Sequence, residues 1–207
     1  MVSIARFTAV ATLLCVVPLS ATQQKTTPSP AKPAVNSDAA TLKDFLKRVD
    51  GYVALHKKLE SQLPDLAKQT TPEAIDKHER ALAALIQAQR KAAKPGDIFS
   101  PAMQRLVRNL LRPVFAGKDG MQIKNEILDN EYKGAVKLAV NGRYPDDVPI
   151  STVPPQVLAQ LPKLPEELEF RFVGDRFILL DKHAHLIVDW VDNVLPIKGG
   201  ETKEAGR

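Results

Sequence analysis

The stretch from Leu168 to Trp190 constrains the fold most strongly, because it combines apolar runs of strand length with two turn signals. Gly174-Asp175 stands where a two-residue hairpin turn belongs, and Asp181 to Ala184 supplies a second turn. The apolar side chains around these turns are Phe170, Phe172, Phe177, Leu179, Leu186, Val188 and Trp190. The pattern predicts a three-stranded antiparallel meander at the centre of the C-terminal half.

The preceding part of the chain has helical rather than strand periodicity. Apolar residues recur every three or four positions from Thr41, and again after a possible capping box formed by Thr70 and Glu73. The residues on the two predicted faces are Leu42, Phe45, Val49, Tyr52, His56, Leu59 and Leu63, then Ile75, His78, Leu82 and Leu85. Two amphipathic helices joined by a short polar link predict an antiparallel helical hairpin.

Shorter elements complete the expected architecture. Ser100 is a predicted N-cap for a helix that ends near Arg112, because Pro113 follows, and residues 121–132 form a further helix. Alternation over residues 135–141 predicts a strand that joins the meander, and the proline-rich residues 148–165 predict an extended wrap over the core. The expected fold class is α+β.

The N-terminus has the pattern of a secretory signal peptide. Residues 1–21 combine the basic Arg6, an apolar run too short to span a bilayer comfortably, and small residues at Ser20-Ala21. We expect cleavage near Ala21 and a periplasmic or secreted protein without a stable transmembrane anchor. The expected divisions are the signal peptide 1–21, a disordered tether 22–40, a helical region 41–117, an α+β region with the meander 118–196, and a disordered tail 197–207.

The chain has one cysteine, Cys15, inside the predicted signal peptide. A mature chain cleaved near Ala21 therefore has no cysteine and must fold without disulfides. Thiol catalysis and thiolate metal ligation are excluded for such a chain.

The most conspicuous candidate site lies at the second predicted turn. Asp181, His183 and His185 lie close in sequence, and imidazoles beside a carboxylate suit Zn²⁺, Ni²⁺ or Cu²⁺. Two histidines at i and i+2 share one side of an extended chain. The alternative is that these residues form a polar turn without a ligand.

The helical hairpin carries a second pair of histidines. His56 and His78 both occupy its predicted apolar faces, about one helical turn apart in the expected register, with Glu60 and Glu79 nearby in sequence. A helical metal site is one reading of this pair. Interfacial histidines bonded to neighbours or water are the other.

The sequence has no recognisable catalytic motif. It lacks a Gly-x-Ser-x-Gly elbow, a His-Glu-x-x-His helix, a phosphate loop and a dinucleotide fingerprint. We therefore expect a non-catalytic binding or structural module without a cofactor, whose partner is an unknown protein or envelope component. The alternatives are a divalent-metal-binding envelope protein that uses His183 and His185, and a hydrolase with a dispersed active site.

A basic stripe follows the helix after Ser100. Arg105, Arg108 and Arg112 recur at helical spacing, which suits either a solvated face or weak anion binding. No glycine-rich loop or interleaved aromatic residues accompany the stripe, so we do not expect a nucleic-acid partner.

Two long phrases carry a resemblance to known proteins. They are GDIFSP, from Gly96 to Pro101, and VNGRYPDDVPISTVPPQVLAQLPKLPEELEFRFVGDRFILLDKHAHLIVDW, from Val140 to Trp190. With these phrases the chain resembles an uncharacterised family of exported bacterial proteins with no known activity. The resemblance implies export and no catalytic residue. Leu186 to Asp189 is also similar to a strand of small periplasmic proteins in nickel and cobalt homeostasis, which implies the metal-binding alternative.

Overall fold

The structure is a computed structural model that describes residues 37–67, 70–129, 137–146, 148 and 152–196. These residues belong to one compact unit spanning residues 35–207. The predicted signal peptide, most of the predicted tether and the predicted tail lie outside the described residues. Among the helices that are described, none has the length and apolar character needed to cross a membrane.

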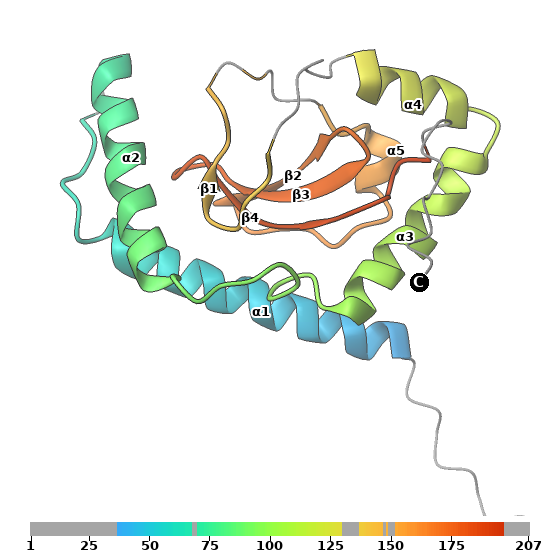
Figure 1. Cartoon of the computed structure of the whole chain (residues 1–207), viewed down its shortest axis with the longest axis horizontal. Helices are drawn as coiled ribbons and strands as arrows, with labels where there is room; N and C mark the ends of the chain where they lie inside the picture. The colour runs from blue at the N-terminus through green and yellow to red at the C-terminus, as the bar shows by residue number, and fades with distance from the viewer. Residues whose placement is uncertain (1–36, 68–69, 130–136, 147, 149–151, 197–207) are drawn as a thin grey trace, which may run out of the picture. The chain divides into compact units, whose positions relative to one another are not determined.

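The described strands form one antiparallel sheet in the order β1-β4-β3-β2 (Figure 1). The strands β2 (Leu168–Val173), β3 (Arg176–Asp181) and β4 (Leu186–Val191) pair consecutively, so the predicted meander is confirmed. The α+β fold class is confirmed with it.

The fourth strand is not where alternation placed it. Residues 137–141 are not a strand, and β1 (Gly142–Arg143) pairs with β4 instead. Asn141 turns the chain with a positive φ of 58°, and its N–H donates to the carbonyl of Ile187. The position of β1 therefore depends on tertiary contacts with β4, which the local alternation in the sequence does not reveal.

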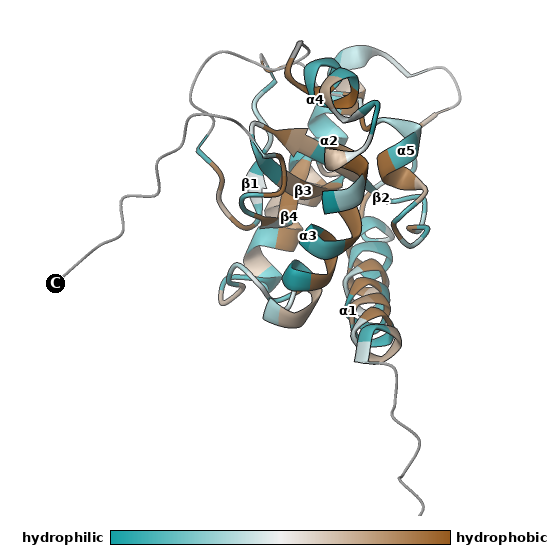
Figure 2. Ribbon diagram, turned by 90° about the vertical axis from the view of Figure 1, so that its right-hand side faces the viewer, coloured by the Kyte–Doolittle hydropathy of each residue, from teal (hydrophilic) through white to brown (hydrophobic). Residues whose placement is uncertain are grey.

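Both faces of β3 are covered, which explains its nearly unbroken burial. Phe177 and Leu179 join the core formed with the helices, while Ile178 and Leu180 join a smaller apolar cluster with Tyr144. In Figure 2 the sheet is correspondingly apolar and the helices show mixed surfaces. The sheet is thus the centre of packing that its sequence predicts.

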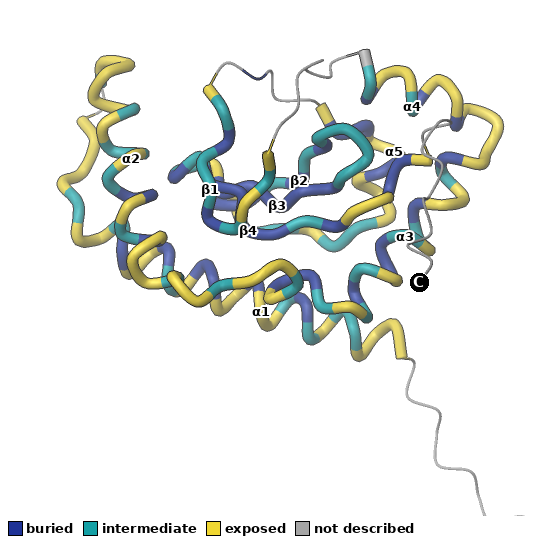
Figure 3. Tube along the Cα trace, in the orientation of Figure 1, coloured by how far each residue is buried: buried dark blue, intermediate teal, exposed yellow. Residues whose placement is uncertain are grey.

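Two long helices precede the sheet. The helix α1 (Ser37–Glu60) packs against α2 (Pro72–Gln89), as expected for the predicted hairpin, and its exposed residues lie away from the sheet (Figure 3). The helix α1 begins at Ser37, so residues 37–40 of the predicted tether are helical. Thr71, rather than Thr70, caps α2 by accepting a hydrogen bond from the Ala74 N–H.

The remaining helices are α3 (Pro101–Ala116), α4 (Gly120–Asp129) and α5 (Pro155–Leu158). Ser100 caps α3 as predicted, but the helix continues through Pro113. Proline removes one backbone hydrogen bond, whereas the additional turn buries Phe115 against Phe172, with ring centroids 6.4 Å apart. Burying a phenylalanine contributes about 2–3 kcal/mol, which offsets that loss.

A buried carboxylate fixes the loop between α2 and α3. Asp189 of β4 is fully buried and accepts hydrogen bonds from the backbone N–H groups of Gly96, Ile98 and Phe99, at 2.8–3.2 Å. Phe99 is thereby held in the core, 5.3 Å from Phe45 between ring centroids. One aspartate thus ties the GDIFSP segment to the sheet and to α1.

Candidate functional site

The candidate site lies where the C-terminal end of α1 meets the turn between β3 and β4. Tyr52 and His56, one turn apart on the buried face of α1, both point to Asp181 at the end of β3. Tyr52 donates its hydroxyl to Asp181 Oδ2 over 2.7 Å, and His56 Nδ1 lies 2.6 Å from the same oxygen. This contact brings together residues that are 125 positions apart.

The other carboxylate oxygen of Asp181 organises the turn itself. Oδ1 accepts hydrogen bonds from the backbone N–H groups of His183, at 3.0 Å, and Ala184, at 2.8 Å. Asp181 is fully buried, and both of its oxygens are occupied by protein donors. The aspartate therefore fixes the turn that presents His183.

Glu60 connects the helix to that turn on the solvent side. Its Oε2 lies 3.2 Å from His56 Nε2, and its Oε1 lies 3.0 Å from His183 Nδ1. The His56 side chain is fully buried, whereas the side chains of Glu60 and His183 are 31% and 40% exposed. The group is thus anchored in the core and open to solvent on one side.

The three side chains each offer one ligand atom, and these atoms lie within 4.8 Å of one another. Donor atoms about 2.1 Å from a tetrahedral metal ion are roughly 3.4 Å apart, close to the two short distances around Glu60. His56, Glu60 and His183 can therefore converge on one metal ion with small side-chain movements.

The electrostatics of the site follow from its two carboxylates. Burial lowers the pKa of His56, but the hydrogen bond and charge of Asp181, together with Glu60, outweigh burial and raise this pKa above its ordinary value. Burial and the Asp181 carboxylate raise the pKa of Tyr52 well above its ordinary value. The Arg90 guanidinium lies over the Tyr52 ring, 4.9 Å from its centroid. The carboxylates thus favour the protonated, cationic form of the His56 imidazole.

The candidate residues of the second turn, Asp181, His183 and His185, lie in different surroundings. His183 is in the group of three donors, whereas Asp181 is occupied by protein hydrogen bonds. His185 has a positive φ of 51° and packs against Tyr144, and its Nε2 lies 4.0 Å from Asp146. The strand geometry that would place His183 and His185 on one side is absent, because both residues belong to the turn.

Glu60 lies between the side chains of the two helical histidines, His56 and His78. His56 is a member of the donor group, while His78 Nε2 lies 3.9 Å from Glu60 Oε1 and outside that group. One histidine of the second-turn pair, His183, thus meets both helical histidines around Glu60. The sequence marks Glu60 only as a neighbour of the helical pair, and its position at i+4 from His56 is the available signal.

The predicted arginine stripe is partly exposed. Arg105 and Arg112 are exposed, whereas Arg108 is half-buried and donates to the backbone carbonyl of Asp192 over 3.0 Å. Arg108 and Arg112 line an open hollow of about 310 Å³ beside Phe115. Weak anion binding by the stripe stays a prediction.

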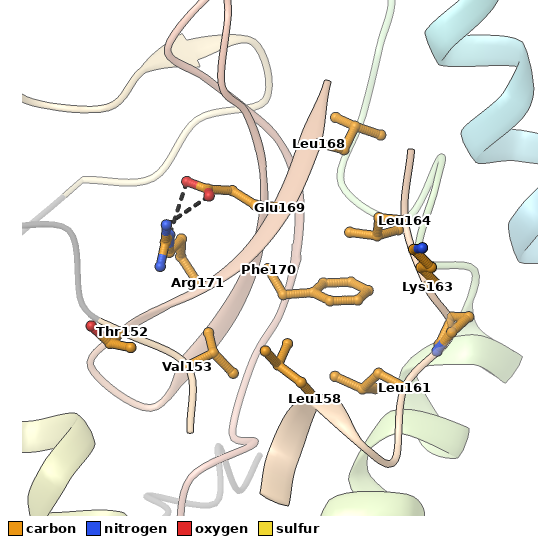
Figure 4. Close-up of a pocket in the computed structure, with 11 residues that line it drawn as sticks. Thr152, Val153, Leu158, Leu161, Lys163, Leu164, Leu168, Glu169, Phe170 and Arg171 are labelled. Carbon is orange, nitrogen blue, oxygen red and sulfur yellow. Dashed lines mark hydrogen bonds and ion pairs between the residues drawn. The ribbon is translucent and has the colours of Figure 1, made fainter. Parts of the chain in front are cut away.

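A groove of about 470 Å³ lies between β2 and the segment around α5 (Figure 4). Its walls are mainly apolar, with Phe170 and Leu158 on opposite sides. Glu169 and Arg171 at its edge bind each other through two contacts of 2.8 and 2.6 Å. Among the described residues that line the groove, the polar ones are Thr152, Lys163, Glu169 and Arg171.

Comparison with known proteins returned no matching family profile, no matching curated protein and no matching solved structure.

Proposed function

We propose that this chain is an exported module that binds a divalent transition-metal ion through His56 Nε2, the Glu60 carboxylate and His183 Nδ1. The observation that carries the proposal is the convergence of these three donors, from a helix and a distant turn, within 4.8 Å. The site combines one histidine from each of the two pairs recognised in the sequence, and Glu60 bridges them.

The donor set favours particular metals. Two imidazole nitrogens and one carboxylate suit Zn²⁺, Ni²⁺ and Cu²⁺, whereas Mg²⁺ and Ca²⁺ prefer sites made of oxygen donors. Because a mature chain would lack cysteine, soft thiolate ligation does not compete. We therefore infer selectivity for a borderline transition metal.

Metal-bound histidines generally make a hydrogen bond to a carboxylate or carbonyl through the ring nitrogen that does not bind the metal, and Asp181 provides this partner for His56. Its bond to Nδ1 fixes the His56 ring and leaves Nε2 directed at Glu60. The same carboxylate holds the backbone of His183. Asp181 thus serves as a positioning residue for both imidazoles and does not itself bind the metal.

The site suits capture of a metal better than turnover of a substrate. The exposed sides of Glu60 and His183 give a metal ion access from solvent. We propose a non-catalytic role in the periplasm or outside the cell. The N-terminal sequence pattern is the basis for inferring export.

Calorimetric titration of the purified protein with Zn²⁺, Ni²⁺ and Cu²⁺ tests this proposal. We expect one site per chain, and binding at least about tenfold weaker in His183→Ala and in Glu60→Gln. His185→Ala is the matched control, since it removes an imidazole two residues away that faces Asp146. Equal heats from His183→Ala and the unsubstituted protein would overturn the assignment, and far-ultraviolet circular dichroism verifies that each variant is folded.

A further inference from the structure

We propose that His78 of α2 becomes a fourth ligand when the metal binds, and that the metal then fastens the N-terminal half of α2 to α1 and to the β3–β4 turn. This inference rests on the proposed function. It adds a residue from a third element of the fold and a structural consequence of binding.

The position of His78 is the first observation. Its Nε2 lies 3.9 Å from Glu60 Oε1, and its side chain is only 13% exposed. Tetrahedral donors are roughly 3.4 Å apart, so an approach of about half an ångström brings His78 to ligand spacing from Glu60. His78 lies outside the group whose donor atoms are within 4.8 Å of one another, so its imidazole must also move toward His56 or His183 when the metal binds.

The coordination number is the second argument. His56, Glu60 and His183 provide three donors, and a structural tetrahedral site requires four. His78 is a nearby imidazole on the same carboxylate, from an element that the other three donors do not include. A fourth protein ligand in place of water converts an open site into a closed one.

The packing of α2 provides the third observation. No residue of α2 from Pro72 to Ala81 is buried, and burial begins at Leu82. This half of α2 is the upper part of the helix in Figure 1. It is held by Arg143, which lies 3.3 Å from both Asp76 and Glu79, and by a contact of 3.1 Å between Arg80 and Asp146. Such partly exposed ion pairs contribute little stability, so this segment has few interactions to resist local opening.

A metal ion bound by four ligands would therefore have its largest structural effect on α2. His56 and Glu60 belong to one rigid helix, and the Asp181 hydrogen bonds already hold His183. Among the four ligands, His78 belongs to the helix turn that a bond to the metal would stabilise most. We expect metal binding to protect the backbone of residues 72–81 more than that of α1.

Titration with Co²⁺ and amide hydrogen exchange, performed on the purified protein and on His78→Ala, test the inference. We expect the strong visible absorption of four-coordinate Co²⁺ in the unsubstituted protein. In His78→Ala we expect a weaker spectrum and at least about tenfold weaker binding, because losing a ligand should cost no less than losing an outer-shell partner. Metal should slow exchange over residues 72–81 only when His78 is present.

The possible failures are distinguishable. If His78→Ala keeps the affinity, the spectrum and the metal-induced protection, while Glu60→Gln loses binding, then His78 is not a ligand and the three-donor site stands. If Co²⁺ and Zn²⁺ bind the unsubstituted protein no better than Glu60→Gln, then the proposed function and this inference both fail. His185→Ala should behave like the unsubstituted protein in all three measurements.

Discussion

His56 Nδ1 lies 2.6 Å from Asp181 Oδ2, and both side chains are completely buried. A buried carboxylate is stable only when it is well satisfied, and Asp181 also accepts bonds from Tyr52, His183 and Ala184. This contact joins α1 to the turn after β3 and directs His56 Nε2 toward Glu60. Fold stability and the candidate metal site therefore depend on the same aspartate.

Replacing Asp181 tests that dependence in the metal-free protein. We expect Asp181→Asn to lower the free energy of unfolding by about 3 kcal/mol, because it removes the charge that balances buried His56 and replaces an acceptor with a donor. Urea denaturation followed by circular dichroism measures the change. Asp192→Asn, at a side chain that is 55% exposed, should change stability by less than about 0.5 kcal/mol. Equal effects of the two substitutions would refute the structural role of Asp181.

Asp189 should control the loop before α3. Asp189→Ala leaves the backbone N–H groups of Gly96, Ile98 and Phe99 without their acceptor, and we expect a loss of about 3 kcal/mol or more. Amide hydrogen exchange should show faster exchange at Ile98 and Phe99 before other core amides respond. Unchanged protection at these two positions would show that the loop is held by something else.

Two glycines should respond to alanine in opposite directions. Gly96 has a positive φ of 92°, and an added Cβ would meet its neighbours only at ordinary contact distances, so the cost of Gly96→Ala is backbone strain of about 1–2 kcal/mol. Gly51 lies within α1 with open space around it, so Gly51→Ala should raise stability by about 0.5–1 kcal/mol. Thermal unfolding compares the two variants, and a destabilised Gly51→Ala would contradict the assigned helix.

The ion pairs beside α2 predict a response to acid. A hydrogen bond from Arg143 lowers the pKa of Asp146, so this carboxylate contributes stability above its unfolded pKa, about 3.9, and loses it as pH falls through the lower folded value. Carboxyl chemical shifts followed by nuclear magnetic resonance measure the titration of Asp146. In Arg143→Gln this pKa should rise toward its ordinary value, and an unchanged titration would contradict the observed pairing.

The parts of the fold that follow from local pattern were predictable. The apolar runs in Leu168 to Trp190 and their two turns predicted the meander, and Ser100 marked the start of α3. Pro113 misled the prediction because the burial of Phe115, which depends on a distant strand, outweighs one lost hydrogen bond. The two-residue β1 pairing likewise depends on contacts between distant segments.

The candidate site was visible in the sequence only as separate fragments. The sequence drew attention to His56, His78 and His183 as residue types, but their meeting depends on how α1 and α2 pack against the sheet. Asp181 is a candidate because of its carboxylate, but protein donors occupy both of its oxygens and it is not in the group of three donors. In the sequence Glu60 is marked only as a neighbour of the helical histidine pair, and tertiary packing places it between three histidines.

Anomalous diffraction from a crystal of the zinc-loaded protein, recorded at the zinc absorption edge, tests the central claim most directly. The account predicts one strong peak within about 2.0–2.2 Å of His56 Nε2, a Glu60 carboxylate oxygen and His183 Nδ1. A fully loaded crystal with no peak among these three residues, or with its peak at His185 instead, would contradict it.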